Sequence, residues 1–341
     1  MERALSRDPA FRFVRALFAA SDATGAAQAL AVAGEGALLE RLEHEKLDAA
    51  AHDRLLGLPP VVSAEGMARM DARRRQYLAH SILRRAEAEE LLESLRSRGI
   101  PAAALKGVDL AWRVYPDPAL RPATDIDLLV PADRLADAEA IVRAAGYLPE
   151  ARTAELRARE RAWIDYQYVH PVSEVMIELH VELLHPGRFT LPGAECLARA
   201  RDGFLAPDDR FVHLALHLAK HGYFGRLIWV HDLALLLAEG EPPAAWRERA
   251  VAAGGRGATW LAVRLTRALF GVRAPALESA LSPGPLRRFL LERLAVRVAR
   301  RPGARLTRRA LQMLLFDDPA RALRYALSRS WRKGTGARAG W

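Results

Sequence analysis

Apolar residues recur every three or four positions through most of the first hundred residues. In residues 73–99 the apolar positions are separated by charged side chains; these positions are Leu78, Ile82, Ala86, Leu91, Leu92 and Leu95. The pattern is typical of an amphipathic helix, and Gly99 favours its end at that point. The residues before position 98 are therefore expected to form a helical region whose main role is packing.

The pattern changes at residue 100. Residues 100–107 form a short apolar run, and residues 124–130 alternate between apolar and polar side chains, as a strand with one buried face does. Residues 132–146 have helical spacing and end in glycine, which suits the position after a helix. Residues 163–170 and 174–185 are typical of two further strands joined by a turn. Together these segments predict a mixed α/β unit.

Beyond about residue 205 the helical spacing returns. The predicted fold class is α+β, and the chain is expected to divide into four parts. These are a helical region over 1–97, an α/β core over 98–190, a second helical region over 191–330 and a flexible basic tail over 331–341. The tail is rich in glycine and charge, so it is expected to hold no structure by itself.

Composition narrows the class of protein. The chain has 341 residues, of which 51% are apolar, and this is enough for a substantial core. Its single cysteine, Cys196, leaves no intrachain disulfide and no thiolate zinc site. The first residues contain no clean apolar segment of a signal peptide, and no apolar run is long enough for a membrane span. A soluble cytoplasmic protein is the expectation.

The net charge of +10 is unevenly distributed. Residues 287–341 contain 15 lysines or arginines against three acidic residues, so the rest of the chain is close to neutral. Such a basic segment could bind nucleic acid or an anionic membrane surface. The alternative is that its arginines form the solvated face of a terminal helix.

Two aspartates interrupt the apolar run of residues 124–130. Side chains alternate between the two faces of a strand, so Asp125 and Asp127 project from one face while Ile126 and Leu128 project from the other. Their Cα atoms are then about 6.6 Å apart, and both carboxylates can reach a pair of divalent cations. A cation site would offset the cost of burying these charges. The alternative is a half-exposed strand that carries carboxylates on its wet face.

Basic groups precede the two aspartates. Lys106 and Gly107 end the first short strand and open an expected helix, whose N-terminal amides favour anions. The glycine allows close approach of a phosphate, and the lysine supplies a point charge. Arg121, four residues before Asp125, can reach the same volume. The segment therefore suggests that one site has a phosphate end and a metal end.

The second acidic strand and a later helix add candidate residues for the cleft. Glu178 and His180 alternate with apolar residues, so one face of their strand is polar. His217 and His221 lie on one face of a predicted helix, with Lys220 beside them. These histidines could line a cleft, pack in the interior or bind zinc, although the segment has no HExxH motif or cysteine set.

Short motifs in a fixed order carry a family resemblance. They are Lys106-Gly107, Tyr115-Pro116-Asp117, Arg121-Pro122, Asp125-Ile126-Asp127-Leu128-Leu129-Val130, Glu178-Leu179-His180 and the segment 213–237. In this order they resemble the uncharacterised bacterial nucleotidyltransferases of the DNA polymerase β superfamily. The resemblance covers roughly residues 70–240 and is most specific between Lys106 and Val130. It implies a small mixed or antiparallel sheet flanked by helices.

Carried over by position, the resemblance also implies roles for these residues. Asp125 and Asp127 would bind Mg²⁺ or Mn²⁺, and Glu178 would be a third carboxylate that binds a second metal or helps to deprotonate the acceptor. Gly107 would lie against the triphosphate. The residues that would bind the nucleotide or neutralise its charge are Lys106, Gly107, Arg121 and Thr124. Val108 stands where the superfamily often has a serine, so one side-chain hydrogen bond to phosphate is missing.

The resemblance predicts transfer of NMP from an NTP, with ATP as the first candidate, to a hydroxyl acceptor. The acceptor could be a small molecule, a peptide or protein side chain, or an RNA end. Catalysis of this kind requires positioning and charge neutralisation rather than a covalent protein nucleophile. Two alternatives stay open. One is a metal-dependent glycosyltransferase, which also uses an Asp-x-Asp motif, and the other is a non-catalytic nucleotide-binding or toxin–antitoxin-type regulatory protein.

Overall fold

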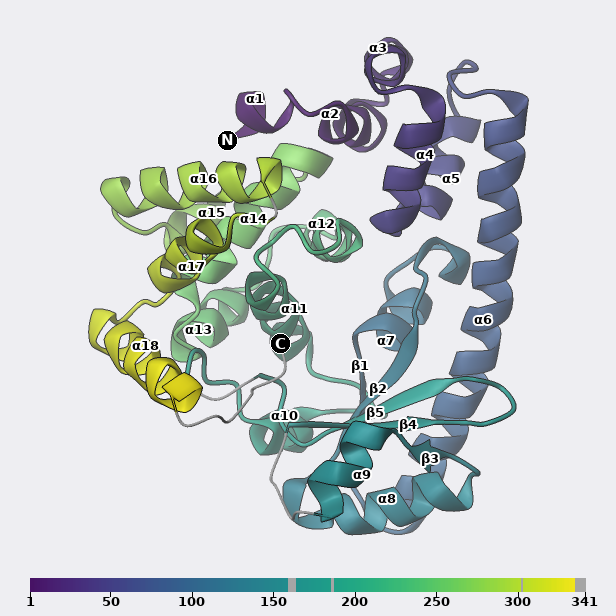
Figure 1. Cartoon of the computed structure of the whole chain (residues 1–341), viewed down its shortest axis with the longest axis vertical. Coiled ribbons are helices and arrows are strands. Elements are labelled where there is room, and N and C mark those ends of the chain that lie inside the picture. The colour runs from purple at the N-terminus through teal and green to yellow at the C-terminus, as the bar shows by residue number, and fades with distance from the viewer. Residues whose placement is uncertain (159–163, 185–186, 302, 335–341) are drawn as a thin grey trace.

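A five-stranded sheet lies between two helical regions (Figure 1). The computed structural model describes residues 1–158, 164–184, 187–301 and 303–334. Trp163 and His185, the end residues of two predicted strands, lie outside the described residues, and so do residues 335–341 of the predicted tail. The α+β class and the mixed sheet flanked by helices are confirmed.

The N-terminal region is a series of helices that ends in one long helix, against which the two preceding helices pack. The helices are α1 (Glu2–Leu5), α2 (Pro9–Arg15), the π-helix Ala16–Ala20, α3 (Ala23–Ala33), α4 (Glu35–His44), α5 (Asp48–Leu56) and the long helix α6 (Ala64–Ser97). The hydroxyl of Ser63 accepts a hydrogen bond from the amide of Gly66, which caps the start of α6. As Figure 1 shows, α4 and α5 lie beside one half of α6, while α7 and the sheet lie beside the other half. Helix α6 therefore joins the N-terminal region to the sheet.

The sheet has the strand order β1-β2-β5-β4-β3. Its strands are β1 (Ala103–Leu105), β2 (Asp125–Leu129), β3 (Leu148–Pro149), β4 (Asp165–Val169) and β5 (Met176–His180). Strands β2 and β5 are parallel, whereas the other neighbouring pairs are antiparallel. The connecting helices are α7 (Lys106–Arg113), α8 (Leu135–Ala144) and α9 (Ala151–Ala158), with short 3₁₀ turns at Pro118–Leu120 and Ala132–Arg134.

The two faces of the sheet differ in chemistry because side chains alternate along each strand. The face toward α6 and α8 is apolar and belongs to one core cluster, which includes Ile126, Leu128, Tyr166, Tyr168, Ile177 and Leu179. The opposite face carries the polar members of the same strands. The apolar residues Leu105 and Leu129, at the edge of this polar face, belong to the larger core that the sheet shares with the helical regions. The polar face is therefore turned toward the helices rather than toward open solvent.

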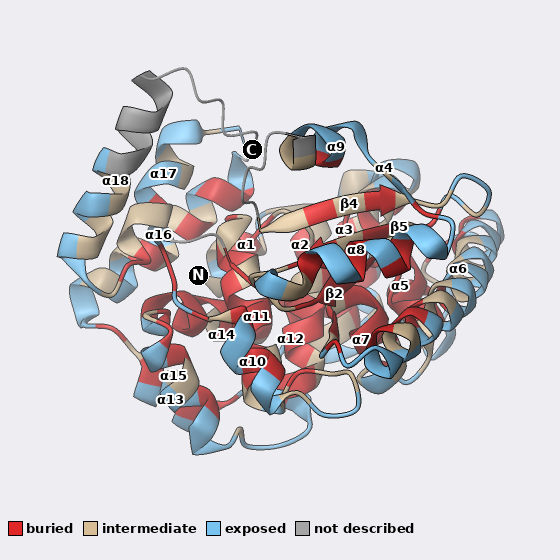
Figure 2. Cartoon of the chain, turned by 90° about the horizontal axis from the view of Figure 1, so that it is seen from below, coloured by how far each residue is buried: buried red, intermediate tan, exposed pale blue. Residues whose placement is uncertain are grey.

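The C-terminal helices complete the larger core. They are α10 (Gly193–Arg199), α11 (Pro207–Lys220), α12 (Ile228–Ala238), α13 (Ala244–Ala252), α14 (Arg256–Phe270), α15 (Pro275–Leu281), α16 (Pro285–Arg300), α17 (Arg305–Leu314) and α18 (Pro319–Gly334). Helices α11, α12 and α14 are mostly buried (Figure 2). None of the helices in the described part of the chain combines the length and apolar character that a membrane crossing requires.

A buried ion pair connects the sheet unit to α12. The guanidinium of Arg121, just before β2, donates to both carboxylate oxygens of Asp232 at 2.6 and 2.8 Å. The hydroxyl of Tyr115 donates to the same carboxylate at 2.8 Å, and it also contacts Nδ1 of His231 at 3.0 Å. Burial opposes the charge on Arg121, but Asp232 outweighs this effect and raises the pKa of the guanidinium. Removing either partner would leave an uncompensated charge in the interior.

We expect Asp232→Ala to lower the free energy of unfolding by roughly 3–5 kcal/mol, because it leaves the buried guanidinium of Arg121 unpaired. The double variant Arg121→Met/Asp232→Leu is expected to recover most of this loss, because it removes both charges. Denaturant titration of the three proteins measures both effects. A single variant as stable as the parent protein would show that the pair does not join these elements.

Candidate active site

Strand register brings the predicted carboxylates together on the polar face of the sheet. Asp125 and Asp127 lie two residues apart on β2, and Asp127 stands opposite Glu178 of the parallel strand β5. Gln167 of β4 stands opposite Glu178 on the other side, and its amide donates to a Glu178 carboxylate oxygen at 2.6 Å. His180, two residues after Glu178, shares the same face. Three neighbouring strands thus contribute to one polar patch.

Asp127 is at the centre of this patch. Its Oδ1 accepts hydrogen bonds from Nζ of Lys106 at 2.8 Å and from Nε2 of His180 at 2.7 Å. The same His180 nitrogen is 3.3 Å from a carboxylate oxygen of Glu178. Asp127 is 4% exposed and His180 is 5% exposed, so these contacts have little competition from water. Lys106 therefore supplies positive charge directly to the buried carboxylate of Asp127.

Lys106 reaches Asp127 because of an unusual backbone turn. The residue directly follows β1, and its φ is +47°, in the left-handed region that favours glycine. Leu105 pairs with Asp127 across the antiparallel strands, so the next residue turns into α7 beside the carboxylate. A non-glycine residue in this region costs stability and is common at functional sites.

The charges of these groups alter one another's pKa values. Burial is the largest effect on Asp127 and would raise its pKa, but Lys106 and His180 outweigh it and lower that pKa. Burial likewise opposes the charge on Lys106, yet Asp127 raises the pKa of the ammonium. Burial and the charge of Lys106 oppose protonation of His180, but its hydrogen bonds to Asp127 and Glu178 raise its pKa. Burial would also raise the pKa of Glu178, whereas the bond to His180 lowers it.

The negative charge of Asp125 is compensated less completely than that of Asp127. Burial, followed by the negative charges of Asp127 and Glu178, raises the pKa of its carboxyl to about 6. Lys106 and Lys46 act in the opposite direction without cancelling these effects. The protein therefore leaves negative charge at Asp125 that an added cation would neutralise.

The residues present fit a divalent cation. Asp127, Glu178 and His180 each offer one ligand atom, and these atoms lie within 4.8 Å of one another. Carboxylate oxygens suit Mg²⁺ and Mn²⁺, and an imidazole nitrogen suits transition metals. The incomplete compensation at Asp125 points in the same direction. Of the metal ligands expected from the sequence, Asp127 and Glu178 belong to this cluster, whereas Asp125 lies two residues before Asp127 on β2 and is not part of it.

Gly107 has a structural reason to be glycine. A Cβ on this residue would lie 2.8 Å from Cβ of Ala123, in the loop before β2, so something would have to shift. The close approach seen here is therefore between α7 and that loop. The predicted contact of Gly107 with a triphosphate stays a prediction.

Arg121 and Thr124, the other residues predicted to bind nucleotide, differ in their surroundings. Arg121 is buried and its guanidinium is paired with Asp232, although its charge still acts on Asp125. The hydroxyl of Thr124 is exposed and donates to Oδ1 of Asp125 at 3.3 Å. Arg121 thus contributes a fixed positive potential, and Thr124 lies at the open edge of the patch.

The histidine helix α11 lies near the same patch. His213 is fully buried, and burial followed by the charges of Lys106 and His180 holds its pKa well below its usual value. Burial and Lys106 also lower the pKa of His217. The ring of His217 packs against His221 and Trp229, with centroids 4.6 and 5.0 Å apart. His213 and His217 are thus neutral imidazoles within electrostatic range of Lys106 in the patch.

Lys220, beside these histidines, is a further cation of the site. Burial and the charge of Lys106 lower its pKa, while Asp165, Glu178 and Asp127 raise it. The side chain thus interacts electrostatically with the carboxylates of β2, β4 and β5. The structure brings the predicted cleft residue Lys220 to the patch.

The sequence reasoning missed Gln167, Lys46 and Arg84 as members of the site. Gln167 lies on a correctly predicted strand, but only the register of β4 against β5 places it beside Glu178. Lys46 lies in the turn after α4 and Arg84 lies on α6, both before the sheet in sequence, and their charges act on Asp125. The signal that could have identified Lys46 is its residue type, because lysine occurs at only four positions in an arginine-rich chain.

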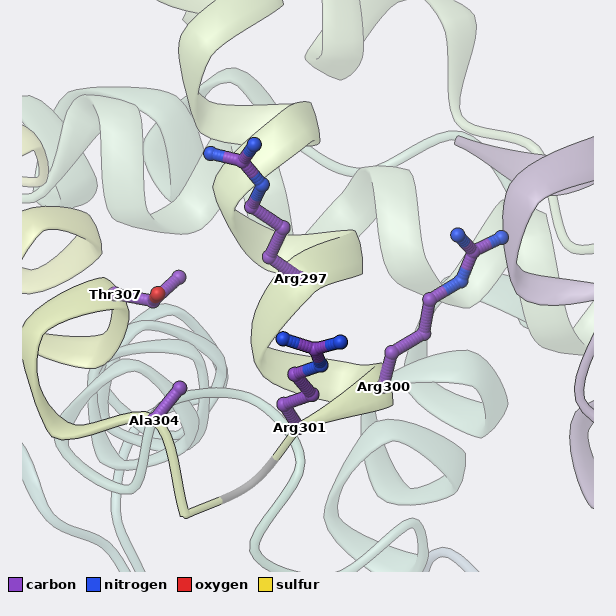
Figure 3. A pocket seen from close by; sticks show the side chains of 5 residues that line it. All are labelled: Arg297, Arg300, Arg301, Ala304 and Thr307. Atoms are coloured by element: carbon purple, nitrogen blue, oxygen red, sulfur yellow. The ribbon is translucent and has the colours of Figure 1, made fainter.

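Within the described residues, the basic C-terminal segment lies mainly on α16 to α18, and some of its arginines have structural roles. Arg287 donates to the carbonyl oxygens of Leu314 and Phe316, and Arg300 donates to the carbonyl oxygen of Ala4. Arg300 also lines a surface hollow of about 480 Å³ (Figure 3), together with Arg297, Arg301, Ala304 and Thr307. The three arginines of the hollow are exposed.

Comparison with known proteins agrees with the geometry of the patch. No curated protein matches this sequence. Residues 33–271, from the last residue of α3 to the residue after α14, match the family described as "Uncharacterised nucleotidyltransferase". This match covers well over half of the chain and includes every strand of the sheet. The chain therefore belongs to this family of uncharacterised nucleotidyltransferases.

Proposed function

We propose that this protein is a metal-dependent enzyme that transfers NMP from an NTP, with ATP as the first candidate, to a hydroxyl acceptor. Membership of a nucleotidyltransferase family supports the general reaction. The observation that carries the finer proposal is the meeting of Asp125, Asp127 and Glu178 on one face of β2 and β5, with Lys106 bonded to Asp127. Phosphoryl transfer requires cations at both the attacking and the leaving oxygens, and such a patch is suited to hold them.

Asp125, Asp127 and Glu178 would hold Mg²⁺ or Mn²⁺. When bound, such cations neutralise charge on the phosphates and lower the pKa of the acceptor hydroxyl. All three residues project from rigid strands, so their oxygens are positioned before substrate binds. Preorganisation of this kind reduces the rearrangement needed in the transition state.

The other residues of the patch keep the carboxylates of Asp127 and Glu178 ionised and oriented. Lys106 and His180 both donate to Asp127, and Gln167 donates to Glu178. Glu178, at the side of the patch next to β4, would accept the hydrogen bond of the acceptor hydroxyl. Lys106, at the start of α7, would neutralise phosphate oxygens of the donor.

The two alternative functions differ in what they require. A glycosyltransferase would take a sugar nucleotide, but the described chain has one small mixed sheet in place of a separate nucleotide-binding α/β unit. A non-catalytic nucleotide-binding or toxin–antitoxin-type protein would bind an NTP and release no pyrophosphate. The acceptor stays open among small molecules, peptides or proteins, and RNA.

Nucleic acid is a candidate acceptor or partner through the basic segment 287–341. The arginine-lined hollow at the end of α16 gives this idea a defined location (Figure 3). Binding of RNA there would weaken steeply with added salt, because each arginine–phosphate contact releases counterions.

We expect Asp127→Asn to reduce Mg²⁺- or Mn²⁺-dependent transfer by at least about 10³-fold, because it removes the central negative charge of the patch. The variant also leaves Lys106 and His180 without their shared carboxylate, so its melting temperature is expected to fall. Transfer of labelled nucleotide is therefore measured well below the melting temperature of the variant. Asp133→Asn, an exposed aspartate after β2, is the matched control and should keep full activity. An active Asp127→Asn variant would contradict the assignment.

We expect Asp125→Asn to raise stability while it abolishes transfer. The ionised Asp125 is disfavoured in the folded protein by burial and by two neighbouring carboxylates. Its neutralisation should therefore stabilise the metal-free protein by on the order of 1–3 kcal/mol at neutral pH. Denaturant titration without metal measures this gain, and thermal melting with Mn²⁺ should show that stabilisation by the ion is lost. Unchanged stabilisation by Mn²⁺ would remove Asp125 from the metal ligands.

The donor and acceptor can be identified in one experiment. The protein is incubated with each labelled NTP, Mg²⁺ or Mn²⁺, and extracts separated into small molecules, proteins and RNA. Labelled product together with pyrophosphate is the expected outcome. Binding without pyrophosphate would support the non-catalytic alternative, and labelling only from a sugar nucleotide would support a glycosyltransferase.

A further inference from the structure

Lys46 occupies an unusual position at the end of α4. Its φ is +57°, and its amide donates to the carbonyl oxygen of Glu43, while the amide of Leu47 donates to that of Leu42. This is the turn that usually ends a helix with glycine in the left-handed conformation. A lysine with a Cβ is disfavoured in this conformation. Helix termination alone therefore does not explain a lysine at this position.

The neighbouring residue, Glu45, fixes this turn against the C-terminal region. Glu45 is 2% exposed, and its carboxylate accepts a hydrogen bond from the amide of Leu227 at 2.8 Å. Its carbonyl oxygen accepts one from the amide of Ile228, and Arg226 donates to the carbonyl oxygen of His44. The end of α4 and the start of α12 are thus locked together. Lys46 and Arg226 are held at this junction.

Lys46 lies within electrostatic range of Asp125 in the carboxylate patch. Burial and the charge of Arg121 lower the pKa of Lys46 to about 8, while Asp125 acts in the opposite direction. Arg226 and Arg84 also lower that pKa, so these cations lie close together. Within the described residues, neither hydrogen bonds nor ion pairs are formed by Nζ of Lys46. The ammonium is partly buried among like charges without a carboxylate in contact.

Arg84 adds a second incompletely satisfied cation. It is half-buried on α6 and donates to the carbonyl oxygen of Thr124, directly before Asp125, at 3.4 Å. Its Nε is buried and has no hydrogen-bond partner among the described residues. Burial lowers the pKa of this guanidinium although Asp125 acts to raise it. Buried donors without partners are costly, so this side of Asp125 lacks an anion that would satisfy them.

The distribution of lysine supports a functional reason for Lys46. Only four of the 51 basic residues are lysines. Three of these, Lys46, Lys106 and Lys220, act electrostatically on the carboxylates of the patch. The chain uses arginine for nearly all other positive charges, whereas compact lysine ammonium groups gather at this site. The residues of α4 also lie inside the segment that matches the family.

We propose that Lys46, Arg84 and Arg226 form a binding site for the polyphosphate of the nucleotide donor on the Asp125 side of the patch. The inference rests on the proposed function and names the part of the substrate that these residues bind. An NTP carries several negative charges on its phosphates, whereas a hydroxyl acceptor needs no such compensation. Asp125 acts electrostatically on Lys46 and Arg84, and Arg84 donates to the carbonyl oxygen of Thr124 next to Asp125. Gln167 and Glu178 lie on the opposite side, toward β4, where the cation Lys220 is accompanied by the carboxylate of Asp165. The charge asymmetry therefore assigns the donor to the Asp125 side and the acceptor to the Glu178 side.

The left-handed conformation of Lys46 provides a sharp test. Lys46→Gly removes the ammonium and at the same time relieves the backbone, so the melting temperature should stay the same or rise. Equilibrium binding of ATP with Mg²⁺ and of inorganic tripolyphosphate to the full-length chain should weaken by at least tenfold. In turnover assays the KM for the NTP should rise, while the KM for the acceptor stays unchanged.

Two control variants separate charge at the site from other effects. Ser21→Gly makes the same backbone change at a residue with φ of +49° that ends the π-helix, outside the patch. Arg293→Ala removes one exposed positive charge on α16. Both variants should bind ATP and tripolyphosphate as the parent protein does.

The possible results distinguish this inference from the proposed function. If the parent protein transfers nucleotide and Lys46→Gly binds ATP and tripolyphosphate with unchanged affinity, the inference is wrong and the proposed function stands. An increase in the KM of the acceptor alone would also overturn it, because the cations would then serve the acceptor. If the parent protein binds neither probe and transfers no nucleotide, both proposals fail.

Discussion

The cost of keeping carboxylates together in a partly dry site is the constraint that organises this protein. Asp125, Asp127 and Glu178 lie on adjacent strands, where their mutual repulsion and their burial both disfavour ionisation. Cations from three regions of the chain offset this cost. Lys46 and Arg84 come from the N-terminal helical region, Lys106 and Arg121 come from the sheet unit, and Lys220 comes from the end of α11. The helical regions are thus part of the electrostatics of the sheet.

The negative charges of the carboxylates are compensated to different extents across the patch. Asp127 has Lys106 and His180 in direct contact, so its carboxylate is secured by the protein. Asp125 has cations nearby but none in contact among the described residues, and its pKa is raised to about 6. A site that is fully neutralised by its own residues would have little affinity for a further ion. The incomplete compensation at Asp125 is therefore the feature that suits the patch to an added cation and an anionic substrate together.

Helices outside the sheet determine the geometry of this arrangement. The pair Arg121–Asp232 joins the loop before β2 to α12, and Glu45 joins the end of α4 to the same helix. Both connections are buried, so they hold their partners without competition from water. As Figure 1 shows, α6 lies along both the N-terminal helices and the sheet. The family match from α4 to α14 includes all of these connections.

The sequence by itself determined the local pattern. Period-two alternation separated Asp125 and Asp127 from Ile126 and Leu128, and helical spacing identified α6 and α8, because these signals depend only on neighbouring residues. Only the tertiary structure determined which of these side chains contact one another. Strand register placed Gln167 beside Glu178. Long-range packing paired Arg121 with Asp232 and brought Lys46 within electrostatic range of Asp125. Charges separated by tens of residues meet according to strand order and helix packing, and neither of these leaves a periodic signal in the chain.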